Sequence, residues 1–205
     1  MMYFTANQNF GSERVLSLYR KEFETLDEMD NALISAWNRV VSRGDEVVIV
    51  GDFSEYSDYK TLSILDKLNG YKHLVVGNHD GFLRSGRVAE KSAFRTIGSV
   101  LNLRHEQSGR WFYASHYPMF SWKGYENGTI LVHGHIHTDG VDGEDKTALE
   151  DFDQGIVYLK RAYDVGADAH GRKPVSAEQI IKDVSKGKCT VLTRRHFISA
   201  EGRKK

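Results

Sequence analysis

Three segments of this 205-residue chain share one pattern, in which a short apolar run leads into a glycine and polar side chains that can bind metal. The run at 46–50 is β-branched, which predicts a strand covered on both faces. Open α/β sheets place their functional sites just beyond strand ends, and glycine lets the backbone turn away tightly there. Three such endings in one short chain predict a common centre. The segments are Val50-Gly51-Asp52, Val76-Gly77-Asn78-His79-Asp80 and Val132-His133-Gly134-His135-Ile136-His137.

The surrounding periodicity predicts one α/β domain over residues 1–205, with parallel strands first and more antiparallel pairing later. We expect one helix capped by Asp30 and ending before Gly44, a second ending before Gly70, and a third over 176–184. Residues 99–105 and 111–115 should form a hairpin. The other expected strands are 3–6, 46–50, 73–76, 129–132, 156–159 and 189–193.

Composition limits the kind of site that the chain can build. The longest aliphatic run is Val47 to Val50, far short of the ~20 apolar residues that a membrane span needs, and no signal peptide is visible. The single cysteine, Cys189, excludes a thiolate-cluster metal site and favours a reducing cytoplasmic location. A transition-metal site must therefore use some of the nine histidines, together with carboxylates and amides.

The formal net charge is zero, but the charge is unevenly distributed. Residues 139–153 carry seven acidic residues and one lysine, whereas 182–205 carry eight basic and two acidic residues. We expect an acidic loop at 139–153 beside the site, where it would repel long nucleic acid, and a solvated basic tail at 199–205.

His135 and His137 are two residues apart, so an extended backbone directs both imidazoles to one side. Imidazole suits Zn, Mn, Fe or Ni, and a carboxylate such as that of Asp52 can bridge two such ions. This spacing is a weak signal alone, and gains weight from the two other strand endings.

Four pieces of the chain together resemble the calcineurin-like metallophosphoesterase superfamily. They are Gly51-Asp52, Gly77-Asn78-His79-Asp80, Ser115-His116-Tyr117-Pro118 and Gly134-His135-Ile136-His137, in the family's order. The resemblance implies a four-layer α-β-β-α sandwich of two mixed sheets flanked by helices. It also implies two divalent metal ions, with Mn expected and Zn, Fe or Ni acceptable.

Carried over residue by residue, the resemblance implies that Asp52 bridges the two ions. Asn78, His116 and His135 would bind the second ion, and His137 the first.

The reaction implied is attack on phosphorus by metal-bound hydroxide. His79 would protonate the leaving oxygen as general acid, and Asp80 would orient His79.

The chain departs from the family at the first motif, which is Asp-x-His at the end of the first strand. Asn7 and Asn9 stand at those two positions, and the flanking Phe4 and Phe10-Gly11 fix the register. A neutral amide oxygen is a poorer ligand than a carboxylate, although asparagine does bind hard cations. We therefore predict one firmly held metal ion and a weak or empty partner position.

Three explanations of Asn7 and Asn9 remain open. The chain could be a natural variant that works with one firm metal ion, or a catalytically silent descendant that binds a phosphorylated ligand or a protein partner. The third is that both asparagines were introduced to trap substrate. The same small amide at both positions favours the third explanation slightly.

The expected function is hydrolysis of a small phosphorylated substrate, preferably a nucleotide phosphodiester. Arg84 and Arg87 could bind its phosphate or leaving group, and Tyr117 could stack on a base, although a solvated arginine is as good an explanation. His133 is expected to support the metal ligands from behind or simply to be packed, and Trp122 is expected to be packed. No membrane partner is expected, and the sequence does not indicate an oligomeric state.

Overall fold

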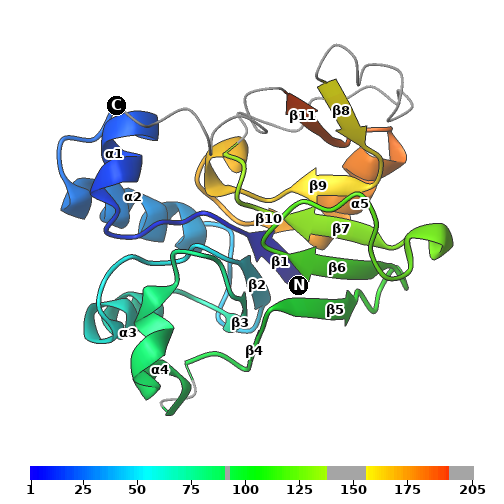
Figure 1. The fold of residues 1–205 in the computed structure, drawn as a ribbon. Coiled ribbons are helices and arrows are strands. Elements are labelled where there is room, and N and C mark those ends of the chain that lie inside the picture. Colours follow the sequence, from blue (N-terminus) through cyan, green and yellow to red (C-terminus); the bar gives the residue numbers. More distant parts are fainter. Residues whose placement is uncertain (91–92, 138–155, 194–205) are drawn as a thin grey trace.

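A computed structural model describes residues 1–90, 93–137 and 156–193 (Figure 1). The predicted acidic loop 139–153 and basic tail 199–205 lie outside the described residues.

The first sheet holds the strands on which two of the three polar segments end. Its order is β10-β1-β2-β3-β4, in which β1 to β4 run parallel and β10 pairs antiparallel with β1. Its side chains alternate between two apolar environments, which is why the run at 46–50 is apolar throughout. The strands are β1 (Met2–Thr5), β2 (Glu46–Val50), β3 (Tyr71–Val75), β4 (Thr96–Gly98) and β10 (Val175–Ser176).

The second sheet, ordered β5-β6-β7-β9, carries the remaining polar segment. The predicted hairpin is present as antiparallel β5 and β6, while β6, β7 and β9 run parallel. A separate antiparallel pair is formed by β8 and β11. The strands are β5 (Val100–Arg104), β6 (Trp111–Ser115), β7 (Ile130–His133), β8 (Ile156–Leu159), β9 (Ala162–Asp164) and β11 (Thr190–Thr193).

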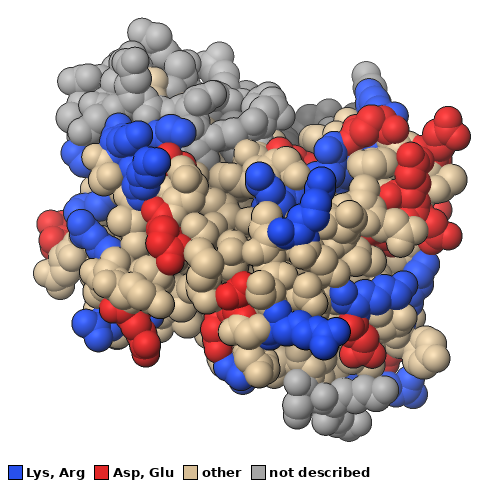
Figure 2. All heavy atoms as spheres, turned by 180° about the vertical axis from the view of Figure 1, so that it is seen from behind, with Lys and Arg blue, Asp and Glu red and all other residues tan. Residues whose placement is uncertain are grey.

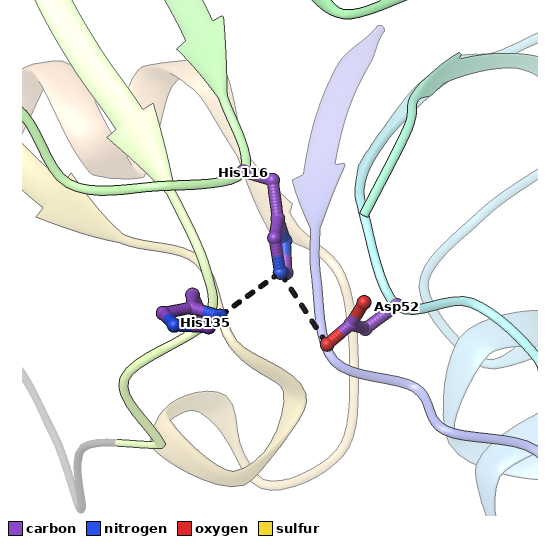
Figure 3. Close-up of side chains that lie close together, drawn as sticks. All are labelled: Asp52, His116 and His135. Atoms are coloured by element: carbon purple, nitrogen blue, oxygen red, sulfur yellow. Dashed lines mark hydrogen bonds and ion pairs between the residues drawn. The ribbon is translucent and has the colours of Figure 1, made fainter. Parts of the chain in front are cut away.

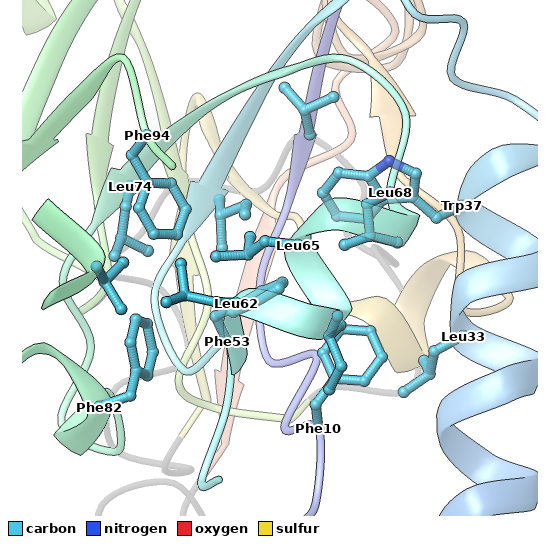
Figure 4. Packing of buried hydrophobic residues seen from close by; sticks show 14 of the residues in the cluster. Phe10, Leu33, Trp37, Phe53, Leu62, Leu65, Leu68, Leu74, Phe82 and Phe94 are labelled. Atoms are coloured by element: carbon cyan, nitrogen blue, oxygen red, sulfur yellow. The ribbon is translucent and has the colours of Figure 1, made fainter. Parts of the chain in front are cut away.

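Helices cover the outer face of the first sheet, where Leu33 and Trp37 of α2 and Leu62 and Leu65 of α3 meet Phe53 in one apolar cluster (Figure 4). The helices of the described chain are α1 (Glu13–Tyr19), α2 (Leu26–Asn38), α3 (Asp58–Lys67), α4 (Arg87–Glu90) and α5 (Ala177–Ser185), with 3-10 turns η1 (Gly81–Ser85), η2 (Tyr125–Asn127) and η4 (Ala167–His170). None of the described helices is long and apolar enough to cross a membrane.

The prediction that Asp30 caps the helix ending before Gly44, which is α2, is wrong. The cap of α2 is Thr25, whose hydroxyl accepts a hydrogen bond from the Glu28 amide at 3.2 Å. Asp30 lies inside the helix, buried, and its carboxylate accepts a bond from the Gly11 amide at 3.2 Å. It therefore ties the helix to the segment that follows β1.

A second apolar cluster fills the space between the two sheets and includes a contact between the Phe4 and Phe112 rings at 4.7 Å. A third lies on the other side of the second sheet, where Leu131 packs against residues of β8 and β11. Two mixed sheets packed face to face, with helices on the outer face of the first, confirm the predicted α/β sandwich, while in the described chain the β8–β11 pair covers the outer face of the second sheet.

The packing of the sheets brings their strand ends together. An isolated parallel bridge joins Ala6, just after β1, to Gly166, just after β9, so the two sheets are linked directly at this edge. The ends of β2 and β7 lie beside this junction, because Asn7 bonds to the backbone of both Gly51 and His135, and the end of β6 joins them through the bond from the Gly134 N–H to the His116 carbonyl. The polar segments therefore share one edge of the sandwich.

Candidate metal centre

Asp52, His116 and His135 form a cluster at this edge (Figure 3). They follow β2, β6 and β7 respectively, and each offers one ligand atom within 4.8 Å of the others. His116 lies in the middle, with its Nε2 atom 3.3 Å from Asp52 Oδ2 and 3.3 Å from His135 Nδ1. Three metal-capable groups from two sheets thus converge on one point.

Asn78 adds a fourth ligand group to this cluster. Its Oδ1 atom lies 3.1 Å from His116 Nε2 and 3.1 Å from His135 Nδ1. The four residues that the sequence assigns to the second ion therefore lie together, and their carboxylate, amide and imidazole groups suit a divalent transition metal. We call Asp52, Asn78, His116 and His135 the ligand cluster.

Contacts around the ligand cluster orient its members for metal binding. The carbonyl of Val50 lies 2.9 Å from His116 Nδ1 and can accept its proton, which leaves the Nε2 lone pair for the cluster. Asp52 Oδ1 accepts a bond from the His79 amide at 2.9 Å. The outer contacts of both ligands therefore come from the backbone of neighbouring strand ends.

The pKa shifts in the ligand cluster favour metal binding at Asp52 and His135, whereas the shift of His116 favours its protonated form. Burial would raise the pKa of Asp52, but the hydrogen bond and charge of His116 lower it below its usual value. Burial would lower the pKa of His116, yet the contact with Asp52 raises it overall. Burial and His116 lower the pKa of His135. An anionic carboxylate and a neutral imidazole are the protonation states that metal binding requires.

The backbone adopts an unusual conformation at the predicted ligands. Seven non-glycine residues of the described chain have positive φ, and five of them are predicted metal ligands: Asn7 (52°), Asn9 (51°), Asp52 (54°), His135 (71°) and His137 (45°). Such backbone strain clusters at functional sites. Asparagine tolerates this conformation better than most residues, so its presence at both 7 and 9 has a conformational reason independent of metal chemistry.

Two glycines of the sequence pattern are required by close approach. A Cβ atom at Gly77 would lie 2.3 Å from Asp52 Oδ1, and one at Gly51 would lie 2.3 Å from His116 Nδ1. Any side chain at either position would displace a member of the ligand cluster.

The first metal position differs sharply from the ligand cluster. Asn7 Oδ1 accepts a hydrogen bond from the His135 amide at 3.0 Å, and no described residue pairs with Asn7 Nδ2 or Asn9 Nδ2. His137 stacks on the Tyr19 ring at 4.8 Å, and its Nδ1 atom lies 3.6 Å from Asp168 Oδ2. We call Asn7, Asn9 and His137 the amide position.

Beneath the amide position lies a buried ion pair that the sequence did not reveal. The Arg20 guanidinium is fully buried, and it donates to the carbonyls of Asn7 at 2.8 Å and Gln8 at 2.7 Å. It also binds Asp168 Oδ1 at 2.8 Å. No pattern links Arg20 and Asp168, which are 148 residues apart and belong to segments for which no helix or strand was predicted.

The structure corrects the expected contact between Asp80 and His79. Asp80 is buried, and its oxygens accept bonds from the amides of Phe53 (2.7 Å), Gly77 (2.7 Å) and Asp52 (3.1 Å). The carboxylate facing the His79 ring is that of Glu55, with Oε1 3.7 Å from Nδ1. Through these three bonds, Asp80 links the ends of β2 and β3.

Two of the three expected substrate-contacting residues lie beside the functional groups. Tyr117 is exposed, with its hydroxyl 3.4 Å from Asn78 Oδ1 and its ring 4.6 Å from that of His135. Arg84 lines a pocket of about 380 Å³, formed with Glu55, Tyr56, Ser57, Asp58, Gly81, Phe82 and Ser85. Arg87 instead pairs with Asp58 at 3.6 Å on the surface.

His133 and Trp122 are packed, as expected. His133 is fully buried, with Nε2 2.8 Å from Thr190 Oγ1, and Trp122 donates its indole N–H to the Thr129 carbonyl at 3.0 Å. Among the described residues, neither side chain forms a hydrogen bond with a side chain of the ligand cluster.

Comparison with known proteins agrees with this geometry. Residues 21–183 match the family model of the calcineurin-like phosphoesterases, so the chain belongs to that family. The matched range begins after Asn7 and Asn9, the two positions at which the sequence departs from the family pattern.

Two relatives and one solved structure share most of the chain. The uncharacterized protein MJ1445 of Methanocaldococcus jannaschii is 27% identical over 190 residues, covering 91% of this chain and 93% of that protein. The gene 66 protein of Mycobacterium phage L5 is 28% identical over 160 residues, covering 66% of this chain and 77% of that protein. The crystal structure of AQ665 from Aquifex aeolicus, a protein of unknown function, superposes with a TM-score of 0.63 at 23% identity, covering 89% of this chain and 98% of that one, which shows a shared fold.

Proposed function

We propose that the protein is a metal-dependent phosphoesterase that hydrolyses a small phosphorylated molecule, preferably a nucleotide phosphodiester. The observation that carries this proposal is the convergence of four ligand groups from two sheets in the ligand cluster. Family membership supports the reaction class, and the substrate preference rests on the surroundings of His79.

The ligand cluster would hold one divalent ion, for which we propose Mn²⁺. Such an ion acts as a Lewis acid toward phosphate oxygens and lowers the pKa of a water molecule. Asp52 supplies the negative charge, and Asn78, His116 and His135 supply neutral donors, a mixture that also accepts Zn, Fe or Ni.

His79 is the proposed general acid. Its side chain is 41% exposed, so the imidazole reaches the solvent-facing side of the site. Its Nδ1 atom faces Glu55 Oε1, which leaves Nε2 to deliver a proton to the leaving oxygen. The His79 amide is bonded to Asp52, and the ring is therefore attached to the same frame as the ligand cluster.

The pocket beside His79 is the proposed binding site for the leaving group. Glu55 both faces His79 and lines this pocket, so the two adjoin. Its volume of about 380 Å³ falls in the range of small-ligand sites, and Arg84, Ser57 and Ser85 offer hydrogen-bond donors.

The surface charge supports a small substrate over a long nucleic acid. On the face seen in Figure 2, the Lys and Arg side chains of the described residues are interspersed with Asp and Glu. Proteins that bind long nucleic acids present a basic stripe or patch along the contact face. We also propose a cytoplasmic location, which the single, buried Cys189 supports.

A second candidate function is a catalytically silent module that binds a phosphorylated ligand or a protein partner. The amide position favours this candidate, because Asn7 directs its only acceptor oxygen at the His135 amide.

Hydrolysis of bis(4-nitrophenyl) phosphate with Mn²⁺ separates the two candidates. We expect turnover by the wild-type chain that is lost in His116→Ala and retained in His73→Gln, a histidine on β3 that pairs with Glu46. Mn²⁺ binding without turnover, in both the wild-type chain and the Asn7→Asp/Asn9→His variant, would contradict the enzyme proposal and leave the binding module.

A further inference from the structure

The side-chain amides of Asn7 and Asn9 are buried donors without acceptors. The two residues are 1% and 2% exposed, and the Nδ2 atom of each has no hydrogen-bond partner among the described residues. A buried N–H group left unpaired is costly, so each amide requires an acceptor atom that the described chain does not supply.

The orientation of the Asn7 amide follows from its one hydrogen bond. The backbone N–H of His135 can only donate, so the atom 3.0 Å away must be Oδ1. An aspartate here would keep a second oxygen for a metal ion. Asparagine presents an NH₂ group instead, and a donor attracts anions and repels cations.

The backbone of Asn7 and Asn9 lies directly beside that of the ligand cluster. The backbone N–H of Asn7 donates to the Gly51 carbonyl at 3.0 Å, and the backbone N–H of Asn9 donates to the Asp52 carbonyl at 2.9 Å. The segment from Asn7 to Asn9 therefore runs alongside the backbone that carries Asp52. A phosphate bound through the ligand cluster would come close to this segment.

The segment is held rigidly from below. The buried Arg20 guanidinium binds the carbonyls of Asn7 and Gln8, and Asp168 balances its charge. The backbone of this segment is therefore fixed, while the Nδ2 atoms of Asn7 and Asn9 have no acceptor among the described residues. Such fixed donors need little reorganisation when an anion arrives.

We infer that Asn7 and Asn9 form an oxyanion subsite, in which their NH₂ groups bind a phosphate oxygen of the substrate. The subsite takes the place of the first metal ion that the family resemblance implies. The residues of the amide position do not fit a divalent ion, since the first motif offers two amides and no carboxylate. This inference rests on the proposed function, because it assigns the substrate's phosphate to the ligand cluster.

Inorganic phosphate added to ¹⁵N-labelled, Zn²⁺-loaded protein tests this subsite by NMR. Zn²⁺ is diamagnetic, and the side-chain NH₂ signals of Asn7 and Asn9 are assigned by their loss in Asn7→Asp and Asn9→Ala. Both signals should shift with a common saturation curve. Phosphate affinity should fall by about tenfold or more in each variant, and Asn9→Ala achieves this without adding charge.

Asn127→Asp is the matched control, because it makes the same change of charge on the exposed η2 turn, which precedes the amino end of β7. It should change phosphate affinity by less than about twofold. Phosphate binding that leaves both NH₂ signals unmoved would overturn the subsite, as would no phosphate binding at all. If both signals shift but bis(4-nitrophenyl) phosphate is not hydrolysed, the subsite stands and the enzyme proposal fails.

Discussion

The ligand cluster and the amide position meet at Asp52 and share the same backbone frame, yet they present opposite chemistry. Both follow the ends of parallel strands and both contain residues with positive φ. The cluster directs lone pairs of Asn78, His116 and His135 to one point, whereas Asn7 and Asn9 present unpaired N–H groups. Of the two metal positions that the family resemblance implies, only the ligand cluster combines a carboxylate with two imidazoles at one point.

The largest loss of activity is expected at His79, whose backbone N–H, but not its ring, is bonded to the ligand cluster. His79→Ala should lower kcat by about 10²–10⁴-fold, because general acid catalysis is lost. Mn²⁺ affinity, measured by calorimetry, should stay unchanged, since the imidazole is not a ligand. A variant with intact turnover would remove His79 from the proton-transfer step.

The next largest effect is expected in Mn²⁺ affinity, which should differ between variants of the ligand cluster and variants of the amide position. His116→Ala should weaken Mn²⁺ binding by at least about 100-fold, more than the loss of a group that only orients a ligand. His137→Ala, at the amide position, should weaken it by less than about threefold. Equal losses in the two variants would show that both positions bind the ion.

The support beneath the amide position should be important for stability. Arg20→Met leaves Asp168 with only His137, 3.6 Å away, and should lower the free energy of unfolding by about 3 kcal/mol, the low end for a buried pair because Asp168 is 21% exposed. Urea denaturation measures this.

The control for this prediction is Arg87→Ala, which breaks an ion pair whose arginine is 68% exposed, and it should change the free energy of unfolding by less than about 0.5 kcal/mol. Similar values for Arg20→Met and Arg87→Ala would mean that the buried pair does not hold the segment.

The smallest effect is expected in the pocket beside His79. Arg84→Ala should raise KM about tenfold, since it removes one charge-assisted contact from the leaving-group site. Arg87→Ala should leave KM within about twofold, because Arg87 does not line the pocket and its pair with Asp58 is exposed on the arginine side. Steady-state kinetics with bis(4-nitrophenyl) phosphate measures both KM values. Equal KM values for the two variants would show that the leaving group does not bind in this pocket.

The sequence predicted the parts of this site that depend on local signals. Apolar runs that end in glycine and polar residues identify strand ends, and parallel strands bring those ends together; Asp52, Asn78 and His135 were predicted to converge in this way. His116 was predicted only from the resemblance to the calcineurin-like family. What the sequence missed depends on contacts between distant segments. Arg20 and Asp168 are 148 residues apart, and the orientation of Asn7 is determined by the backbone of His135.

Local patterns also failed where another contact prevailed. Asp30 has the right type for a helix cap, yet Thr25 begins the helix and Asp30 binds Gly11 instead. Asp80 follows His79 in sequence, but three backbone amides hold it away from the ring. The short strands β4 and β9 were not predicted, since three-residue elements carry too little periodicity.

The number of metal ions per chain tests the contrast between the two positions most directly. Titration of the metal-free protein with Mn²⁺ should give one tightly bound ion for the wild-type chain and two for Asn7→Asp/Asn9→His, which restores a carboxylate and an imidazole to the first motif. Two ions of comparable affinity in the wild-type chain, or no additional ion in the double variant, would contradict the account.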